Sequence, residues 1–81
     1  MQVDTCIKQL IAHSDKSYRA VSAQLGKSPN WAGVTAQPGR NPKLSTVADI
    51  ADVLGYRLNV VDVATGEEVG TIDPPRKAAR D

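Results

Sequence analysis

Apolar residues recur along the chain with two different periods, one typical of helices up to Gly55 and one typical of strands after it. Over residues 3–13 the apolar side chains are spaced by three and four positions, which predicts an amphipathic helix. The buried stripe of this helix is predicted to be Val3, Cys6, Ile7, Leu10 and Ile11, with Asp4, Lys8 and Gln9 facing outward.

Two short helices are predicted on either side of Gly26. Ser17 is a suitable N-cap for a helix over residues 18–25, and Gly26 can end that helix in the left-handed conformation. Ser28 and Pro29 then supply an N-cap and a first-turn proline, which predicts a third helix over residues 29–37. Its core-facing residues are expected to be Ala32 and Thr35. Helices joined by so short a turn cross steeply, as they do in a helix-turn-helix.

A fourth helix is predicted after a loop over residues 37–43, which is rich in proline and glycine. Gly55 is expected to end this helix. Asp49 and Asp52 are expected to point away from its buried face. That face is predicted to consist of Leu44, Val47, Ile50, Ala51 and Leu54.

Alternation of apolar and polar residues from Tyr56 to Val63, a turn over 64–67 and a return strand over 68–72 predict a β-hairpin. A two-stranded hairpin alone is marginally stable in water. We therefore expect it either to pair with the hairpin of a second chain or to cover the core of its own chain. The second helix of a helix-turn-helix is the one that enters a DNA major groove. Pairing of two hairpins would place two such helices about 34 Å apart, which is one turn of DNA. The residues predicted to dimerise are Tyr56, Leu58, Val60 and Val69.

The register of several residues resembles the Cro/cI-like helix-turn-helix of the XRE family of transcriptional regulators. The residues that carry this resemblance are Ser17, Val21, Leu25-Gly26, Ser28, Asn41-Pro42, Leu44, Val47, Ile50-Ala51 and Leu54-Gly55. The resemblance implies a mainly α fold, a four-to-five-helix Cro/cI-like (lambda repressor-like) bundle followed by a C-terminal β-hairpin. It assigns residues 1–55 to a helix-turn-helix DNA-binding domain. The residue pattern that follows adds a dimerisation hairpin (56–73) and a flexible basic tail (74–81).

The resemblance also implies which side chains would contact DNA. Residues of the third helix would contact base edges: Asn30, Gly33, Val34 and Gln37. Phosphates would be bound from the start of the second helix, the turn and the following loop, by Ser17, Tyr18, Arg19, Lys27, Ser28, Arg40, Asn41 and Lys43. The chain departs from the family pattern at Pro29, where a polar residue is usual, and its third helix has no Arg or Lys.

Charge is separated along the chain, although the net charge is only +1. Residues 16–48 contain five bases and no acid, whereas residues 49–73 contain six acids and one base. The basic segment coincides with the predicted DNA-binding helices, which favours a nucleic-acid partner. A solvated charged face would be the plainer explanation.

The composition offers no set of catalytic or metal-binding residues. His13 is the single histidine and Cys6 the single cysteine, and no phosphate-binding glycine loop is present. We therefore predict no enzyme activity, cofactor or metal, and a cytoplasmic protein without a membrane segment. The predicted function is a sequence-specific DNA-binding regulator that acts on double-stranded DNA as a homodimer. The alternative is an antitoxin-like or inhibitor-like module that binds a protein partner, with DNA contact secondary or lost.

Overall fold

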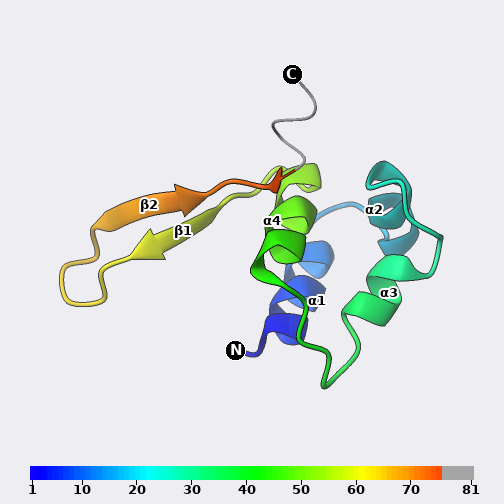
Figure 1. Cartoon of the computed structure of the whole chain (residues 1–81), viewed down its shortest axis with the longest axis horizontal. Helices are drawn as coiled ribbons and strands as arrows, with labels where there is room; N and C mark the ends of the chain where they lie inside the picture. The colour runs from blue at the N-terminus through cyan, green and yellow to red at the C-terminus, as the bar shows by residue number, and fades with distance from the viewer. Residues whose placement is uncertain (76–81) are drawn as a thin grey trace.

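Four helices followed by one antiparallel hairpin make up the part of the chain that the computed structural model describes, residues 1–75 (Figure 1). The elements are α1 (Val3–His13), α2 (Tyr18–Gln24), α3 (Trp31–Thr35), α4 (Leu44–Val53), β1 (Leu58–Val61) and β2 (Glu68–Ile72). The predicted mainly α class with a C-terminal hairpin is confirmed at this level. Most of the predicted tail, residues 76–81, lies outside the described residues.

The buried side of α1 differs from the predicted stripe. Ile7 and Ile11 are buried as expected, but Asp4 is also buried and Val3 is exposed. Residues spaced by three and four lie in one row on a helix, and the row through both isoleucines continues to Asp4. The outward orientation predicted for Asp4 is therefore wrong. Asp4 lies in the first turn of α1, where the helix dipole favours a carboxylate.

The core between the helices is built from aliphatic residues and alanines. Its members are Ile7, Ile11, Val21, Leu25, Ala32, Ala36, Val47, Ile50 and Leu54. Two predictions for this core are wrong. Ala36, one turn after Ala32, faces the core while Thr35 is only half-buried, and Leu44 is 57% exposed while Ala48 is buried.

The start of α3 is also later than predicted. Ser28 and Pro29 precede the helix in a turn, which the Trp31 amide closes by donating to the Ser28 carbonyl at 3.0 Å. Asn30 occupies the N-cap position, and its side chain makes no capping hydrogen bond. The next amide of α3, that of Ala32, consequently has no capping acceptor from the N-cap side chain.

Ser22 on α2 supplies that acceptor. Its side chain is fully buried, and its Oγ accepts the N–H of Ala32 at 2.9 Å. The same hydroxyl donates to the Tyr18 carbonyl at 2.9 Å. Ala32 is the second residue of α3, and the amide at that position is one that an N-cap side chain usually satisfies. A residue of α2 therefore caps α3 and fixes the position of one helix against the other.

The end of α2 and its start follow the sequence prediction. Ser17 Oγ accepts the Ala20 N–H at 3.0 Å, which is a side-chain N-cap. Gly26 has a φ of 70°, and the Lys27 amide donates to the Ser22 carbonyl at 2.9 Å. A left-handed residue at this position reverses the chain so that α3 can begin a few residues later.

The hairpin extends away from the helices, on the side opposite α2 and α3 (Figure 1). Its strands pair from Leu58↔Ile72 to Val61↔Glu68, with an irregularity between Val60 and Val61. Tyr56 and Leu58 at its start pack against the helical core, and β1 becomes exposed from Val60 on. The start of the hairpin therefore packs on the core of its own chain, whereas its outer part does not.

Replacement of Ser22 by alanine tests the cross-helix cap. Ser22→Ala leaves the buried Ala32 amide without its acceptor, so we expect the free energy of unfolding to fall by about 1–3 kcal/mol. For a domain of this size each kcal/mol corresponds to roughly 4–8 °C in Tm, which thermal unfolding followed by circular dichroism resolves. The matched control is Ser28→Ala, at an exposed hydroxyl that has no partner among residues 1–75. The control should change stability by less than about 0.5 kcal/mol. Equal losses from both variants would contradict the assignment.

Two glycine-to-alanine changes are expected to have opposite signs. Gly26→Ala forces a side chain into the left-handed region and should destabilise the protein by about 1–2 kcal/mol, although the surrounding space is open. Gly33→Ala places its Cβ 3.6 Å from Tyr18 Cδ2, an ordinary contact, and removes a glycine from the interior of α3. We expect this second change to stabilise the protein by up to about 1 kcal/mol. Urea unfolding of both variants measures the two shifts, and a loss of stability in Gly33→Ala would show that α3 does not tolerate a Cβ there.

Candidate nucleic-acid interface

An open hollow lies between the start of α2 and one side of α3, and we call it the α2–α3 hollow. Its volume is about 540 Å³. It is lined by Ser17, Tyr18, Arg19, Pro29, Asn30, Gly33, Val34 and Gln37. The fold thus brings together all four residues predicted to contact bases and three of those predicted to contact phosphate.

Local features of α3 shape this hollow. Gly33 carries no side chain, and the Tyr18 ring lies close to it, 3.6 Å from where a Cβ would be. Asn30 and Val34, one turn apart, are exposed at the surface. Gln37 follows the C-cap residue of α3, and its amide still donates to the Val34 carbonyl at 3.2 Å. Gln37 therefore lines the hollow although α3 is shorter than predicted.

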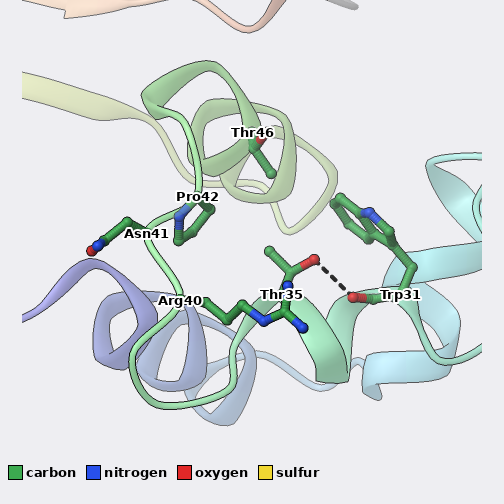
Figure 2. Close-up of a pocket in the computed structure, with 6 residues that line it drawn as sticks. All are labelled: Trp31, Thr35, Arg40, Asn41, Pro42 and Thr46. Carbon is green, nitrogen blue, oxygen red and sulfur yellow. Dashed lines mark hydrogen bonds between the residues drawn. The ribbon is translucent and has the colours of Figure 1, made fainter.

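A second hollow lies on another side of α3, between this helix and the start of α4, and we call it the α3–α4 pocket (Figure 2). Its volume is about 310 Å³, and it is lined by Trp31, Thr35, Arg40, Asn41, Pro42 and Thr46. Figure 2 shows the indole of Trp31 and the ring of Pro42 on opposite sides of this pocket, with the Asn41 amide pointing outward. Thr35 Oγ1 donates to the Trp31 carbonyl at 2.8 Å.

The two hollows use different rows of α3. Asn30 and Val34 line the first, whereas Trp31 and Thr35 line the second. Residues four positions apart share a face of a helix, so each pair marks one row. As a result α3 stands between a hollow that contains Arg19 and a pocket that contains Arg40.

The remaining predicted phosphate contacts lie near these hollows without lining either. Lys27 and Ser28 are on the turn between α2 and α3, and Lys43 is the N-cap residue of α4. Lys27 Nζ lies 5.7 Å from the centroid of the Trp31 ring, a cation–π contact worth about 0.5–1 kcal/mol at an exposed site. Lys27 is therefore drawn toward α3 and adds positive charge beside it.

The basic side chains of this surface are available to an external anion. Lys16, Arg19, Lys27, Arg40 and Lys43 are all exposed. Within residues 1–75 none of the five forms an ion pair with another described residue; the ion pair found there joins Arg57 to Glu68 on the hairpin. Positive charge that is not neutralised internally can interact with phosphate.

Three residues that shape the surface were not identified by sequence reasoning. Thr46 and Pro42 line the α3–α4 pocket, and Ser22 caps α3 from α2. Pro42 stands in a predicted loop, and its position against Trp31 depends on how the loop folds back. The period of α4 identifies buried positions alone, so it gave no signal for Thr46. Ser22 lies beside Val21 on the buried side of α2, where a hydroxyl must have a partner.

The four predicted dimerisation residues fall into two pairs. Tyr56 and Leu58 are half-buried against the helices, and the Tyr56 ring centroid lies 5.8 Å from that of His13. Val60 and Val69 lie out on the hairpin and are 48% and 71% exposed. The second pair is thus accessible to another chain, whereas the first anchors the hairpin.

The described residues present a hydrogen-bonding and cationic surface around α3. Among residues 1–75 no three His, Cys, Asp or Glu side chains are grouped so that they could hold a metal ion. No helix in that range is long and apolar enough to cross a membrane. No protein-family model, curated protein or solved structure matches this chain, so its function has to be inferred from the surface described above.

Proposed function

We propose that the chain is a sequence-specific DNA-binding transcriptional regulator of the Cro/cI-like helix-turn-helix type, which binds as a homodimer and inserts the α3 region into the major groove. The observation that carries this proposal is the α2–α3 hollow, which gathers Asn30, Gly33, Val34 and Gln37 beside the start of α2. The Cro/cI-like fold is part of the proposal.

The side chains of the hollow suit base edges. Asn30 and Gln37 end in amides, which can bond adenine N6 and N7 in bidentate fashion. Val34 is 38% exposed and can contact a thymine methyl. Gly33 lies between them, and its missing side chain leaves room for the Tyr18 ring, which lies 3.6 Å from where a Cβ would be. Together these groups favour a site rich in A·T pairs.

The positions of the basic side chains suit the two phosphate chains that border a major groove. Arg19 lies in the hollow on one side of α3, and Arg40 lies in the pocket on the other. The major groove is about 12 Å wide, so a helix within it has phosphates on both sides. Because α3 itself has no charged residue, most of the binding energy would come from these flanking contacts.

The second candidate is a protein-binding module on the same fold, antitoxin-like or inhibitor-like, with DNA contact secondary or lost. The observation that favours it is the composition of α3, five residues without a charge, WAGVT. The two functions differ in salt dependence, since phosphate-driven binding weakens steeply as salt rises. A protein interface centred on α3 would depend far less on salt.

Removal of two basic side chains from the loop after α3 should reduce the salt dependence of DNA binding. For Arg40→Ala combined with Lys43→Ala, we expect the slope of log K against log salt to become less negative by about 1.8, at roughly 0.9 per phosphate contact. Fluorescence anisotropy with a duplex selected from a random pool, between 50 and 200 mM salt, measures this slope. Lys8→Ala, on α1 and outside both hollows, is the control and should leave the slope unchanged. A double variant that keeps the wild-type slope would show that the loop does not contact phosphate.

Removal of the two amides should reduce specificity without affecting phosphate binding. Asn30→Ala and Gln37→Ala should each lower the preference for the selected duplex over a scrambled one by about 1–3 kcal/mol. The salt slope on scrambled DNA should stay the same, because the phosphate contacts are intact. Gln2→Ala, an exposed amide outside both hollows, is the control. Unchanged discrimination in both amide variants would remove α3 from the reading surface.

A further inference from the structure

The hairpin carries apolar side chains that are exposed in the part of the chain that the structure describes. Val60 and Val61 on β1 are 48% and 47% exposed, Val69 on β2 is 71% exposed, and Val63 in the turn is 98% exposed. The strands extend away from the helices (Figure 1), and a two-stranded hairpin is marginally stable in water. The outer part of the hairpin is therefore a candidate surface for association with another chain.

The two free edges of the hairpin differ in how well they are protected. Natural proteins protect exposed strand edges with charges, prolines or bulges. β2 begins with the charged Glu68, and the irregularity in pairing leaves Val69 without a partner on β1. β1 reads Leu-Asn-Val-Val, with no charge, no proline and no extra residue. The edge of β1 is therefore the one open to a further strand.

We propose that β1 pairs in antiparallel fashion with β1 of a second copy of this chain, about a two-fold axis that passes beside Asn59. The resulting sheet has four strands in the order β2-β1-β1-β2. The inference rests on the proposed function only in that such a dimer would present two α3 regions to one DNA site. The pairing itself can be tested without DNA.

The direction of the backbone groups on β1 supports this axis. The Asp62 N–H donates to the Glu67 carbonyl at 2.8 Å and its own carbonyl accepts from Gly66 at 2.7 Å, so the polar groups of Asp62 face β2. These directions alternate along a strand, which leaves the groups of Asn59 and Val61 facing the free edge. Two copies of Asn59 can then form a mutual hydrogen-bonded pair.

The side chains select this register over the neighbouring one. An axis at Asn59 places Leu58 opposite the partner's Val60, and the same apolar pair repeats across the axis. An axis at Val60 would instead place Leu58 opposite the partner's Asp62. Opposed side chains in antiparallel strands lie about 4.5–5.5 Å apart, so a carboxylate against leucine is unfavourable. The apolar pairing favours the axis at Asn59.

Charge complementarity favours the same arrangement. Arg57 Nη2 lies 4.0 Å from Glu68 Oε1 of its own chain, with side chains 70% and 56% exposed. In the proposed register Arg57 lies opposite the partner's Val61, and Val61 pairs with Glu68 in each hairpin. The long side chain of Arg57 can cover that valine and reach the partner's Glu68. The basic residue before β1 of each copy thus lies near the acidic residue at the start of the partner's β2.

A hollow at the start of the hairpin lies where the turn of the partner would arrive. It has a volume of about 750 Å³, and its lining includes Leu10, His13 and Tyr56. The proposed register places Tyr56 opposite the partner's Asp62, directly before the partner's turn. The partner's Val63 then lies beside this hollow.

Cysteine cross-linking tests the register in the full chain. In a Cys6→Ser background, Asn59→Cys should form a disulfide-linked dimer on mild oxidation, because an opposed hydrogen-bonded pair has Cα atoms about 5.5 Å apart, within disulfide range. Val60→Cys in the same background is the matched variant and should cross-link poorly, since it opposes Leu58. Preferential cross-linking through Val60→Cys, or none through either variant, would overturn the proposed pairing.

Sedimentation equilibrium tests whether the surface drives association. The wild-type chain should be a dimer, and Val60→Lys should raise the dimer dissociation constant by roughly tenfold or more, because it places an ammonium against the partner's Leu58. Leu44→Lys, at a leucine that is 57% exposed outside the hairpin, should leave the dimer intact. A wild-type monomer, or a Val60→Lys dimer of undiminished affinity, would contradict the inference. Salt-dependent DNA binding by such a protein would still support the DNA-binding part of the proposed function, but not its homodimeric form. A cross-linked dimer without DNA binding would contradict that function and leave the pairing intact.

Discussion

One buried hydrogen bond, from the Ala32 amide to the Ser22 hydroxyl, fixes the relation of the two helices that carry the candidate interface. It joins residues ten positions apart in sequence, at a length of 2.9 Å, in a site without exposure to water. A buried amide that loses its acceptor is costly, so α3 cannot slide or rotate against α2 without breaking this contact. The placement of the α3 residues of the hollow against the start of α2 depends on it. The alanines at positions 32 and 36 act in the same sense, because small side chains let α3 approach the core closely.

The brevity of α3 has consequences for binding. A helix of five residues gives few base contacts, and this one contains no charge. Recognition through it would be limited to amide, methyl and backbone contacts. Most of the affinity would come from phosphate contacts of the basic side chains on either side of α3. A single head of this kind would bind DNA weakly. Two helical domains joined in one rigid dimer would bind DNA more tightly than one, because the second binds at a high effective concentration. Weak DNA binding by a single α3 is therefore consistent with an association surface on the hairpin.

The sequence predicted the elements better than it predicted the contacts between them. The bounds of α1 were correct because its period is strong, and Gly26 ended α2 because a left-handed residue was needed. The start of α3 was misplaced because Ser28 and Pro29 are a local signal, whereas the cap that forms comes from Ser22 on another helix. Asp4 was misplaced for a different reason, because its charge suggested exposure although it lies in the same helical row as Ile7 and Ile11. The resemblance named the four α3-region residues that line the hollow, Asn30, Gly33, Val34 and Gln37, but it did not predict the hollow itself. The α3–α4 pocket depends on how a loop folds back onto Trp31, which no local pattern indicates.

The separation of charge along the chain becomes a separation in space. The five basic residues lie in the segment that carries α2, α3 and the following loop. Four of the acidic residues lie within residues 62–73 of the hairpin. In the proposed complex the hairpin would be repelled by phosphate while the helices are attracted to it, which orients each head toward the duplex. The same acidity would oppose association of two hairpins lying side by side in parallel. An antiparallel arrangement would instead place each acidic end at the partner's Arg57. The charge that would keep the hairpin away from DNA would thus also favour one direction in which two hairpins can pair.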